Sequence, residues 1–517
     1  MSLSRRRFLG MAGGAALVAA GASGLAGCGG AGAGQTAELL RSRVPLPPRF
    51  RTPLPIPPVK RPVRSDAHAD HYEITQRVRE IEILPGYRTP VFGYDGLFPG
   101  PTIRSRSGRR TVVTHRNELP VPTVVHLHGG NTPAEHDGYP VDLLYPEGTT
   151  AAHQHTGMTG DTRHGSREYV YPLRQPAATL WYHDHRMDFT APQVWRGLAG
   201  FHLVDDDITD ALPLPHGERD VPLLICDRAF DEDGSFRYPS LDPALRHPPG
   251  VTADFMEGVA GDVILVNGAP WPTMEVDAAR YRFRLLNASN ARRYRLTLRP
   301  NPRGGDGFTQ IASDSGLLAA PVRHSHLDIA PAERFEVVVD FSRYPVGTEV
   351  VLGNDLGSGP TAEVMRFVVA RKAADDSAVP ARLAEIEPLP AAAARIRREW
   401  TFSRGEVHGH RGWVVNGRPF DPRRMDAHPR LGEVEVWRLF TDLHHPVHIH
   451  LSPFQVLGRG GRGPGPFDHG WKDTVDVRPA EYVDVAVRFE NHAGPFLMHC
   501  HNLEHEDMAM MAAFETR

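Results

Sequence analysis

A cysteine between two histidines near the carboxyl terminus is the feature of this sequence best suited to chemistry. Cys500 lies between His499 and His501, and His505 and Met510 follow shortly after. A thiolate, imidazoles and a weak thioether are the ligands of copper sites that transfer electrons. Successive side chains of an extended segment point to opposite sides, so His499 and His501 face away from Cys500. These two histidines are therefore free to bind a second metal centre.

Three more histidine clusters supply ligands for that second centre. Each cluster contains two histidines separated by one residue, and on a strand such a pair points to the same side. One pair alone is weak support for a metal site, but three pairs together with the Cys500 segment are not expected by chance. The clusters are His126-Leu127-His128, His183-Asp184-His185 and His445-Pro446-Val447-His448-Ile449-His450.

Together these clusters resemble the copper signature of the multicopper oxidases. The segments TLWYHDHRMDF and HPVHIHLSPFQVL are similar to the branch that holds spore-coat laccases and bilirubin oxidases, and the resemblance covers about residues 66–517. It implies a laccase-like oxidoreductase with four coppers. Such an enzyme couples one-electron oxidation of a small aromatic substrate, such as a phenol, to the reduction of dioxygen to water. Electrons would pass from Cys500 to His499 or His501.

The resemblance also implies which copper each ligand binds. The type 1 copper would take His445, Cys500 and His505, with Met510 as a weak axial ligand. Met508 and Met511 are alternatives for that axial position, but the spacing from Cys500 favours Met510. The type 2 copper would take His126 and His448 with a water-derived ligand. The two type 3 coppers would take His128, His183 and His501 on one ion, and His185, His450 and His499 on the other.

Two acidic residues are candidates for proton delivery, which dioxygen reduction in a buried site requires. Asp137 follows the first histidine pair, and Glu506 adjoins the ligand His505. In the resembled branch, carboxylates at these positions deliver protons. The alternative interpretations are structural: Asp137 as a turn residue, and Glu506 as a hydrogen-bond acceptor for a ligand.

Other histidines and cysteines do not share this pattern. Cys226, within VPLLICDR, is predicted to be a buried strand residue. With Cys500 assigned to copper and Cys28 to the amino-terminal signal, no disulfide is expected. Three further histidine pairs are interpreted as loop residues, with an accessory copper site as the alternative. These pairs are His153 and His155, His324 and His326, and His408 and His410.

Three similar strand-and-turn units position the clusters. A Gly/Pro turn precedes alternating strand residues near positions 98–117, 266–287 and 415–440. This spacing is typical of a hairpin-rich Greek-key sandwich. We predict an all-β fold of three sequential cupredoxin-like domains, at residues 66–210, 215–372 and 396–517. The copper clusters fall only in the first and third, so the second metal centre is expected between them, with the middle domain as a spacer and substrate wall.

Length and composition are those of a globular protein of several domains. The chain has 517 residues, with 40% hydrophobic and 23% charged residues. The formal net charge of -4 gives no indication of nucleic-acid binding. We expect a monomer whose partners are dioxygen and a small reducing substrate.

The amino terminus is typical of an export signal. Arg5-Arg6-Arg7 followed by an apolar stretch resembles a twin-arginine signal, and Leu25-Ala26-Gly27-Cys28 resembles a lipoprotein box. We predict a signal at residues 1–28 and a lipid anchor at Cys28. A proline-rich tether at 29–65 is expected to follow and then to wrap the first domain. The protein would then lie in the cell envelope, or outside the cell. Cleavage without lipid and a permanent anchor helix are the alternatives.

The substrate is less closely defined by the sequence than the metal site. Bilirubin oxidases tend to carry Trp two residues before the type 1 histidine, where this chain has Leu443. A metal-ion oxidase would need an acidic cluster beside His445, and only Asp442 lies there. A copper-handling envelope protein is a further alternative. A copper nitrite reductase is disfavoured because it has two cupredoxin domains and lacks the full type 3 ligand set.

Overall fold

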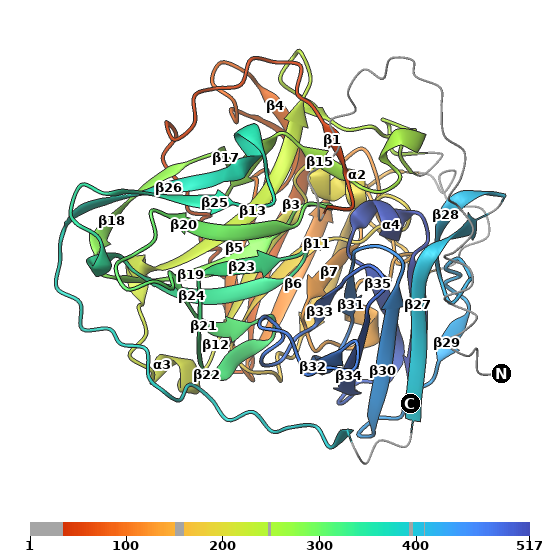
Figure 1. Ribbon diagram of the computed structural model, residues 1–517. Helices are drawn as coiled ribbons and strands as arrows, with labels where there is room; N and C mark the ends of the chain where they lie inside the picture. The colour runs from red at the N-terminus through yellow and green to blue at the C-terminus, as the bar shows by residue number, and fades with distance from the viewer. Residues whose placement is uncertain (1–34, 150–159, 247–249, 392–395, 408) are drawn as a thin grey trace, which may run out of the picture. The chain divides into compact units, whose positions relative to one another are not determined.

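The computed structural model describes residues 35–149, 160–246, 250–391 and 396–517, except residue 408. Strands are the main regular secondary structure of this part of the chain (Figure 1). Its α-helices have at most six residues each: α2 (Thr190–Trp195), α3 (Asp207–Asp210) and α4 (Leu503–Asp507). The predicted all-β class is therefore confirmed. Within the described residues, no helix is long and apolar enough to span a membrane.

The first pair of sheets carries the first two histidine clusters. One sheet has the order β10-β6-β3-β2 with β4 beside β3, and the other has the order β5-β12-β11-β7. The strands are β2 (Arg64–Ser65), β3 (Ala69–Ile81), β4 (Thr89–Tyr94), β5 (Gly100–Arg106), β6 (Arg110–Asn117), β7 (Val125–His128), β10 (Ser166–Tyr171), β11 (Ala178–Asp184) and β12 (Ala199–Asp205).

The second pair of sheets holds none of the predicted copper ligands. Its larger sheet has the order β17-β16-β13-β19-β24-β21-β22 with β14 beside β13, and the smaller has the order β18-β26-β25-β20-β23. The strands are β13 (Asp220–Phe230), β14 (Phe236–Arg237), β16 (Val263–Val266), β17 (Ala269–Pro270), β18 (Thr273–Ala278), β19 (Arg280–Asn287), β20 (Tyr294–Arg299), β21 (Phe308–Ser313), β22 (Gly316–His324), β23 (His326–Ile329), β24 (Arg334–Asp340), β25 (Glu349–Asn354) and β26 (Glu363–Lys372).

The third pair of sheets carries the remaining clusters. Its sheets have the orders β28-β27-β30-β34-β32 and β29-β36-β35-β31-β33. The strands are β27 (Ile396–Val407), β28 (His410–Val415), β29 (Met425–Ala427), β30 (Val434–Thr441), β31 (His445–Ile449), β32 (Phe454–Arg459), β33 (Thr474–Val477), β34 (Tyr482–Arg488), β35 (Gly494–Cys500) and β36 (Met511–Thr516).

Minor elements connect these sheets. A two-stranded parallel pair joins β8 (Leu144–Tyr145) to β9 (Arg163–His164). The described 3-10 helices are η1 (Ala134–His136), η3 (Gly217–Arg219), η4 (Ala253–Phe255), η5 (Phe341–Arg343) and η6 (Gly359–Ala362).

Each pair of sheets encloses apolar side chains from both of its members, as a sandwich does. In the third pair, Trp437 of β30 and Val485 of β34 share a buried cluster with Phe496 of β35 and Phe514 of β36. Each pair is also drawn from one continuous stretch of chain, 64–205, 220–372 or 396–516. The three domain boundaries remain a prediction.

Strand β24 departs from the simple alternation expected of a half-buried strand. The residues on its polar side, Arg334 and Glu336, are buried along with the apolar ones. The reason is that this face meets β11: the Thr179 hydroxyl donates to Glu336 Oε1 at 2.7 Å, and Arg334 Nε donates to the Thr179 carbonyl at 2.9 Å. The middle sheets therefore reach the strand that carries His183.

The described part of the proline-rich segment does not simply wrap the first sheets, as the sequence suggested. Strand β1 (Glu38–Leu40) pairs in parallel with β15 (Val259–Gly261), which belongs to the middle stretch. Ser42 then bonds Asp262, and Pro53 bridges to Thr273. Only at Val59 does the segment reach Thr102 of the first sheets. Edge pairing with β15 gives its backbone amides partners that proline-rich sequence alone does not reveal.

Removal of a core side chain in the middle sheets should destabilise the chain measurably. Leu265 of β16 is fully buried, whereas Leu431 is 36% exposed. We expect Leu265→Ala to lower the free energy of unfolding by about 2–5 kcal/mol, and Leu431→Ala by no more than about 0.5 kcal/mol. Urea unfolding followed by tryptophan fluorescence measures both. Equal unfolding midpoints for the two variants would contradict this assignment of the core.

Candidate metal centres

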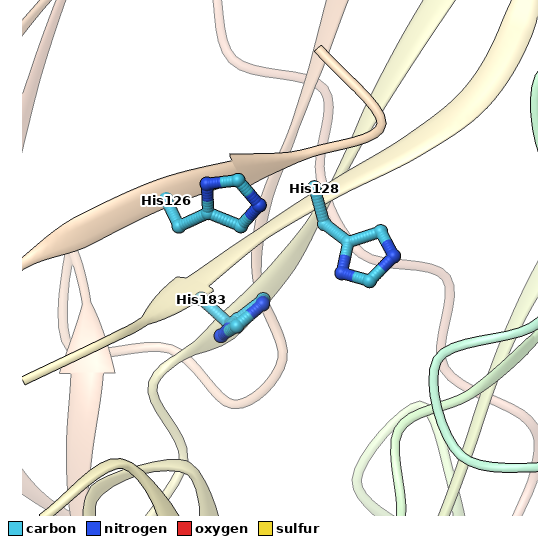
Figure 2. A group of neighbouring side chains, drawn as sticks. All are labelled: His126, His128 and His183. Carbon is cyan, nitrogen blue, oxygen red and sulfur yellow. The ribbon is translucent and has the colours of Figure 1, made fainter. Parts of the chain in front are cut away.

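Strand registry in the first sheets brings two histidine clusters side by side. Strands β7 and β11 are antiparallel neighbours, with His126 opposite His183. Each His-x-His pair therefore turns its rings to one side, as the spacing predicts. Figure 2 shows His126, His128 and His183 grouped where the two strands run together. One ligand atom from each lies within 4.8 Å of the other two.

Strand registry in the third pair of sheets brings the other two histidine clusters side by side. Strands β31 and β35 are antiparallel neighbours, with His448 opposite His499 and Val447 opposite Cys500. The two sets meet directly, because the ring of His126 stacks on His450 at 4.0 Å and that of His128 on His448 at 3.6 Å. The structure thus gathers eight histidines, each at most 1% exposed: His126, His128, His183, His185, His448, His450, His499 and His501.

Ligand atoms in this histidine cluster form several overlapping groups. His126 belongs both to the group with His128 and His183 and to one with His448 and His450. The groups only partly follow the predicted type 3 sets. His185, His450 and His499 form one group, as predicted, whereas His501 lies 5.1 Å from His128 and 5.3 Å from His183, ring to ring.

Hydrogen bonds fix which nitrogen of several rings is free to bind a metal. The Nδ1 atom of His126 donates to the Asp137 carbonyl at 2.6 Å, and Nδ1 of His183 donates to that of Asp184 at 2.8 Å. In the same way, His448 Nδ1 donates to the Asp473 carbonyl at 2.8 Å. The Nε2 atom of each of these three rings is buried and has no hydrogen-bond partner. Clustered, buried lone pairs of this kind fit metal ions.

Burial also keeps these imidazoles uncharged. It lowers the pKa of His183 to about 3 and holds the pKa values of His126 and His448 well below their ordinary range. A neutral imidazole is the form that binds a metal. The cluster therefore fits cations in its centre and does not fit eight protonated rings.

A second, smaller group surrounds the cysteine. The Sγ atom of Cys500 lies 3.4 Å from His445 Nδ1 and 3.6 Å from His505 Nδ1, and these nitrogens are 3.0 Å apart. The outer nitrogens have acceptors of their own: His445 Nε2 contacts Asp442 Oδ1 at 2.9 Å, and His505 Nε2 contacts the Glu257 carbonyl at 3.2 Å. Both Nδ1 lone pairs are thus directed at the sulfur, an arrangement that suits a copper ion.

Methionine side chains lie near this second group. Met510 is fully buried in the same apolar cluster as Cys500, and its carbonyl accepts from the Cys500 amide at 3.1 Å. Met511 packs in a different cluster. Met508 is only partly buried. The surroundings of the three methionines are therefore consistent with Met510 as the axial ligand.

The two candidate acids contact the histidine cluster. His450 Nδ1 donates to Asp137 Oδ2 at 2.7 Å, and burial raises the pKa of Asp137 to about 7. Glu506 lies 3.1 Å from His499 Nδ1 and 3.5 Å from His185 Nδ1. Burial alone would raise the pKa of Glu506, but these histidines outweigh it and hold that pKa below its ordinary value. Asp137 therefore titrates near neutral pH.

A small cavity adjoins the cluster. Its volume is about 10 Å³, and His126, His448, Gly129, Ser315 and Asp473 are among the residues that line it. This volume is close to the least that holds one water molecule. The cavity therefore offers a place for a solvent-derived ligand beside His126 and His448.

The remaining candidates lie outside these groups. His324 Nε2 donates to Gln310 Oε1 at 3.0 Å, and its ring packs against Phe467. No metal group among the described residues includes His324 or His326. His153, His155 and His408 lie outside the described residues. Cys226 is a buried residue of β13, as predicted, and both described cysteines are free.

Sequence reasoning missed several residues that contact the metal groups. Trp413 stacks on His505 with ring centres 3.8 Å apart. Asp473 Oδ1 lies 3.1 Å from His128 Nε2, and Arg334 pairs with that carboxylate. The one local feature that could have indicated them is Lys472-Asp473, two charged residues directly before the largely apolar strand β33. Its meaning depends on Arg334, which is far away in sequence.

Comparisons with known proteins agree with this geometry. The Multicopper oxidase family profiles match residues 76–208 and 392–517. A laccase of Bacillus subtilis is 36% identical, covering 90% of this chain and 97% of its own length. A bilirubin oxidase of Albifimbria verrucaria is also 36% identical, covering 91% of this chain and 82% of its own length. The crystal structure of a multi-copper oxidase from Pediococcus acidilactici superposes with a TM-score of 0.79 at 32% identity, covering 93% of each chain. The chain belongs to the multicopper oxidase family.

Proposed function

We propose that this protein is a laccase-like oxidase of the cell envelope that oxidises phenolic or related aromatic substrates. As a multicopper oxidase it is a copper-dependent oxidoreductase with dioxygen as acceptor. When bound, the four coppers accept single electrons from the substrate and reduce dioxygen to water. The observation that carries the proposal is Cys500: its sulfur lies in the group with His445 and His505, and its two neighbours in sequence lie in the histidine cluster.

This arrangement gives the chain a covalent connection between its two metal groups. The side chain of Cys500 points toward His445 and His505, whereas His499 and His501 point into the histidine cluster. Only a few bonds of one strand end separate the sulfur from the imidazoles. A protein that merely stored copper would not need its two sites joined in this way.

The ligand roles proposed from the sequence are supported by these contacts. We assign His445, Cys500, His505 and Met510 to type 1 copper, and His126 and His448, beside the small cavity, to type 2 copper. The type 3 pair would take the other six histidines, with His128, His183 and His501 on one ion and His185, His450 and His499 on the other.

Electrons would enter at the His445 side of the type 1 group. The ring of His505 is covered by Trp413, and its outer nitrogen faces the Glu257 carbonyl. The outer nitrogen of His445 instead faces Asp442, whose side chain is 35% exposed. A substrate at the surface therefore comes nearest to the type 1 group beside Asp442.

The surroundings of this entry favour an aromatic substrate over a metal ion. Asp442 also accepts a hydrogen bond from the Arg404 amide at 2.9 Å. The nearby carboxylate of Glu257 is paired with the Arg404 guanidinium. Among the described residues around His445, carboxylates free to bind an incoming cation are therefore few. If the protein were a metal-ion oxidase instead, it would oxidise metal ions in preference to phenols when the two kinds of substrate are compared.

Export and anchoring are proposed from the sequence alone. The twin-arginine signal would carry the folded protein out of the cytoplasm, and Cys28 would hold a lipid anchor. Mass spectrometry of the mature protein distinguishes a lipidated Cys28 from simple cleavage.

The oxidase function can be tested in one cuvette. We expect the copper-loaded protein to be intensely blue and to consume dioxygen with a methoxyphenol. Cys500→Ser should remove the blue absorption, lower the copper content by about one ion per chain and abolish uptake, because the thiolate is the soft ligand of type 1 copper.

Cys226→Ser is the matched control, because Cys226 is equally buried but lies away from every metal group. It should keep the blue colour and the uptake. Blue colour without dioxygen uptake in the unmodified protein would contradict the oxidase proposal and favour the copper-handling alternative.

The pH dependence of turnover should identify Asp137 as a proton donor. With its pKa raised to about 7, this carboxyl is protonated below that pH and can donate, and it loses the proton above it. We expect kcat for dioxygen uptake to fall as pH rises through about 7. Asp137→Asn should lower kcat about 100-fold at pH 6 and remove this fall.

Glu135→Gln is the control for the loss of a nearby charge, because Glu135 is exposed on the short helix η1, which ends just before Asp137. It should keep both the rate and the pH profile of the unmodified enzyme. A wild-type rate for Asp137→Asn would show that Asp137 does not supply protons and acts only as a structural acceptor for His450.

A further inference from the structure

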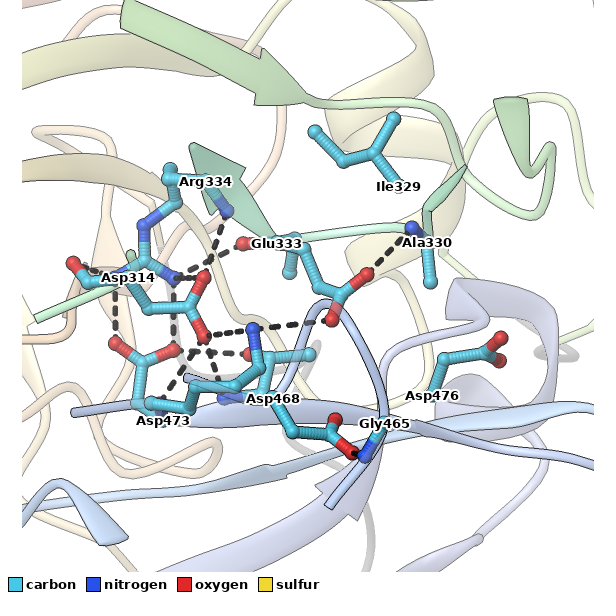
Figure 3. Close-up of polar contacts among 12 residues, drawn as sticks. Asp314, Ile329, Ala330, Glu333, Arg334, Gly465, Asp468, Asp473 and Asp476 are labelled. Atoms are coloured by element: carbon cyan, nitrogen blue, oxygen red, sulfur yellow. Dashed lines mark hydrogen bonds and ion pairs between the residues drawn. The ribbon is translucent and has the colours of Figure 1, made fainter. Parts of the chain in front are cut away.

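Five charged side chains are buried beside the histidine cluster. They are Asp314, Glu333, Arg334, Lys472 and Asp473, and none has a side chain more than 6% exposed. Figure 3 labels four of them, Asp314, Glu333, Arg334 and Asp473, among the polar contacts of this network. Isolated buried charges are strongly destabilising, and even paired ones recover their desolvation cost only with good geometry. A network of this size therefore calls for an explanation beyond stability.

Arg334 uses every hydrogen-bond donor that it has. Its Nε atom donates to the Thr179 carbonyl at 2.9 Å. One terminal nitrogen donates to the Ala332 carbonyl at 2.9 Å and to Asp473 Oδ1 at 2.7 Å. The other donates to the Asp314 carbonyl at 3.0 Å and to Asp473 Oδ2. The guanidinium thus joins β11, the middle sheets and the start of β33, and it holds the Asp473 carboxylate by both oxygens.

Lys472 fixes the same segment from the other side. Its Nζ atom lies 3.0 Å from Asp314 Oδ2 and 3.1 Å from Glu333 Oε1. Asp314 Oδ2 in turn accepts from the backbone amides of Asp473 and Thr474, each at 3.3 Å. Both the backbone and the side chain of Asp473 are therefore held by residues that contact no copper ligand directly.

Asp473 contacts two histidines of the cluster in different ways. Its carbonyl accepts from His448 Nδ1, as other carbonyls do for His126 and His183. Its carboxylate instead lies 3.1 Å from His128 Nε2, and the Thr474 hydroxyl lies at the same distance. That hydroxyl donates to Asp473 Oδ1 at 3.0 Å, so the carboxylate orients it as well.

His128 is therefore turned the opposite way from those three neighbours. The contact at Nε2 leaves Nδ1 as the nitrogen without a partner, whereas His126, His183 and His448 have a free Nε2. An acceptor at one nitrogen of an imidazole determines which nitrogen keeps the lone pair. The Asp473 carboxylate thus sets the tautomer in which His128 faces the cluster.

The backbone beside His128 is closely packed against Arg334 and Asp473. A Cβ atom on Gly129 would lie 2.7 Å from an Arg334 nitrogen and 2.8 Å from Asp473 Oδ2. Gly129 also has a φ of +85°, which favours glycine. The ion pair is thus packed directly against the residue that follows His128.

We propose that Arg334 and Lys472 are positioning residues for the trinuclear site. Arg334 holds the Asp473 carboxylate against His128 Nε2, and Lys472 holds Asp314, which fixes the Asp473 backbone amide, so that His128 offers Nδ1 to its metal. This inference rests on the proposed ligand role of His128. It gives the middle sheets, which supply no copper ligand, a direct part in shaping the copper site.

Arg334→Lys is the sharpest test, because lysine keeps the charge but cannot hold both carboxylate oxygens. We expect the variant to keep the blue absorption of type 1 copper. Its trinuclear coppers should be removed by a chelator at about 10- to 100-fold lower concentration, which is the usual effect of losing an outer partner of a ligand. The type 2 electron paramagnetic resonance spectrum should also change its hyperfine splitting, because the carbonyl of the displaced Asp473 accepts from His448, a proposed type 2 ligand.

Arg284→Lys is the matched control. Arg284 of β19 is equally buried, holds Asp220 by both oxygens at 2.7 Å and 2.9 Å, and lies one strand from Arg334 in the same sheet. It contacts no histidine of the cluster. Arg284→Lys should therefore leave chelator resistance and the type 2 spectrum unchanged, even where it lowers the melting temperature.

The outcomes separate this inference from the proposed function. A wild-type protein without a type 2 signal would overturn both. A wild-type protein with all its coppers, together with an unchanged Arg334→Lys, would overturn only the positioning role. Equal effects of Arg334→Lys and Arg284→Lys would do the same, since they would indicate general destabilisation. Where Arg334→Lys fails to fold, Asp473→Asn decides: the same spectral change supports the role, and a wild-type spectrum overturns it.

Discussion

Eight imidazoles crowded into one buried volume are the constraint on which the rest of this structure depends. Several of their nitrogens face one another at close range, such as Nε2 of His499 with Nε2 of His450 at 3.1 Å and of His185 at 3.3 Å. Facing lone pairs repel, and protonated rings would repel more strongly without water to screen them. The arrangement is favourable only with cations at its centre, so copper completes the fold at this point.

That constraint explains how the surrounding elements are built. Strand pairs β7–β11 and β31–β35 present rings on one side because alternate residues share a face. The outer nitrogens then need acceptors that are fixed in place, and the carbonyls of Asp137, Asp184 and Asp473 provide them. Cys500 extends the same geometry to a second group, since its side chain alternates away from its neighbours. The histidine cluster thus follows from the registry of two strand pairs, and α4 adds His505 to the second group.

Sequence alone could predict the parts that depend on local spacing. The His-x-His pairs and the position of Cys500 required only the two-residue period of a strand, and the all-β class followed from repeated turns and alternation. Pairings between distant residues were not predictable. Arg334 is 139 residues from Asp473, and Asp473 is 345 residues from His128. Arg334 begins a Phe-Glu-Val-Val-Val strand, and an arginine in that position would be predicted from sequence to be exposed. It is buried only because the sheet packs against β11.

Asp137 and Asp473 show how one residue type takes two roles at the same metal cluster. Both are buried, and both accept from a histidine of the cluster. Burial raises the pKa of Asp137 to about 7, with only histidines and a threonine to oppose it. Burial acts on Asp473 as well, but the Arg334 guanidinium outweighs it and holds the pKa of that carboxyl below its ordinary value. A carboxyl without a cation can carry protons, whereas one bound to an arginine keeps a fixed charge and a fixed place. In the function proposed above, the position of one guanidinium would therefore separate proton supply by Asp137 from ligand orientation by Asp473.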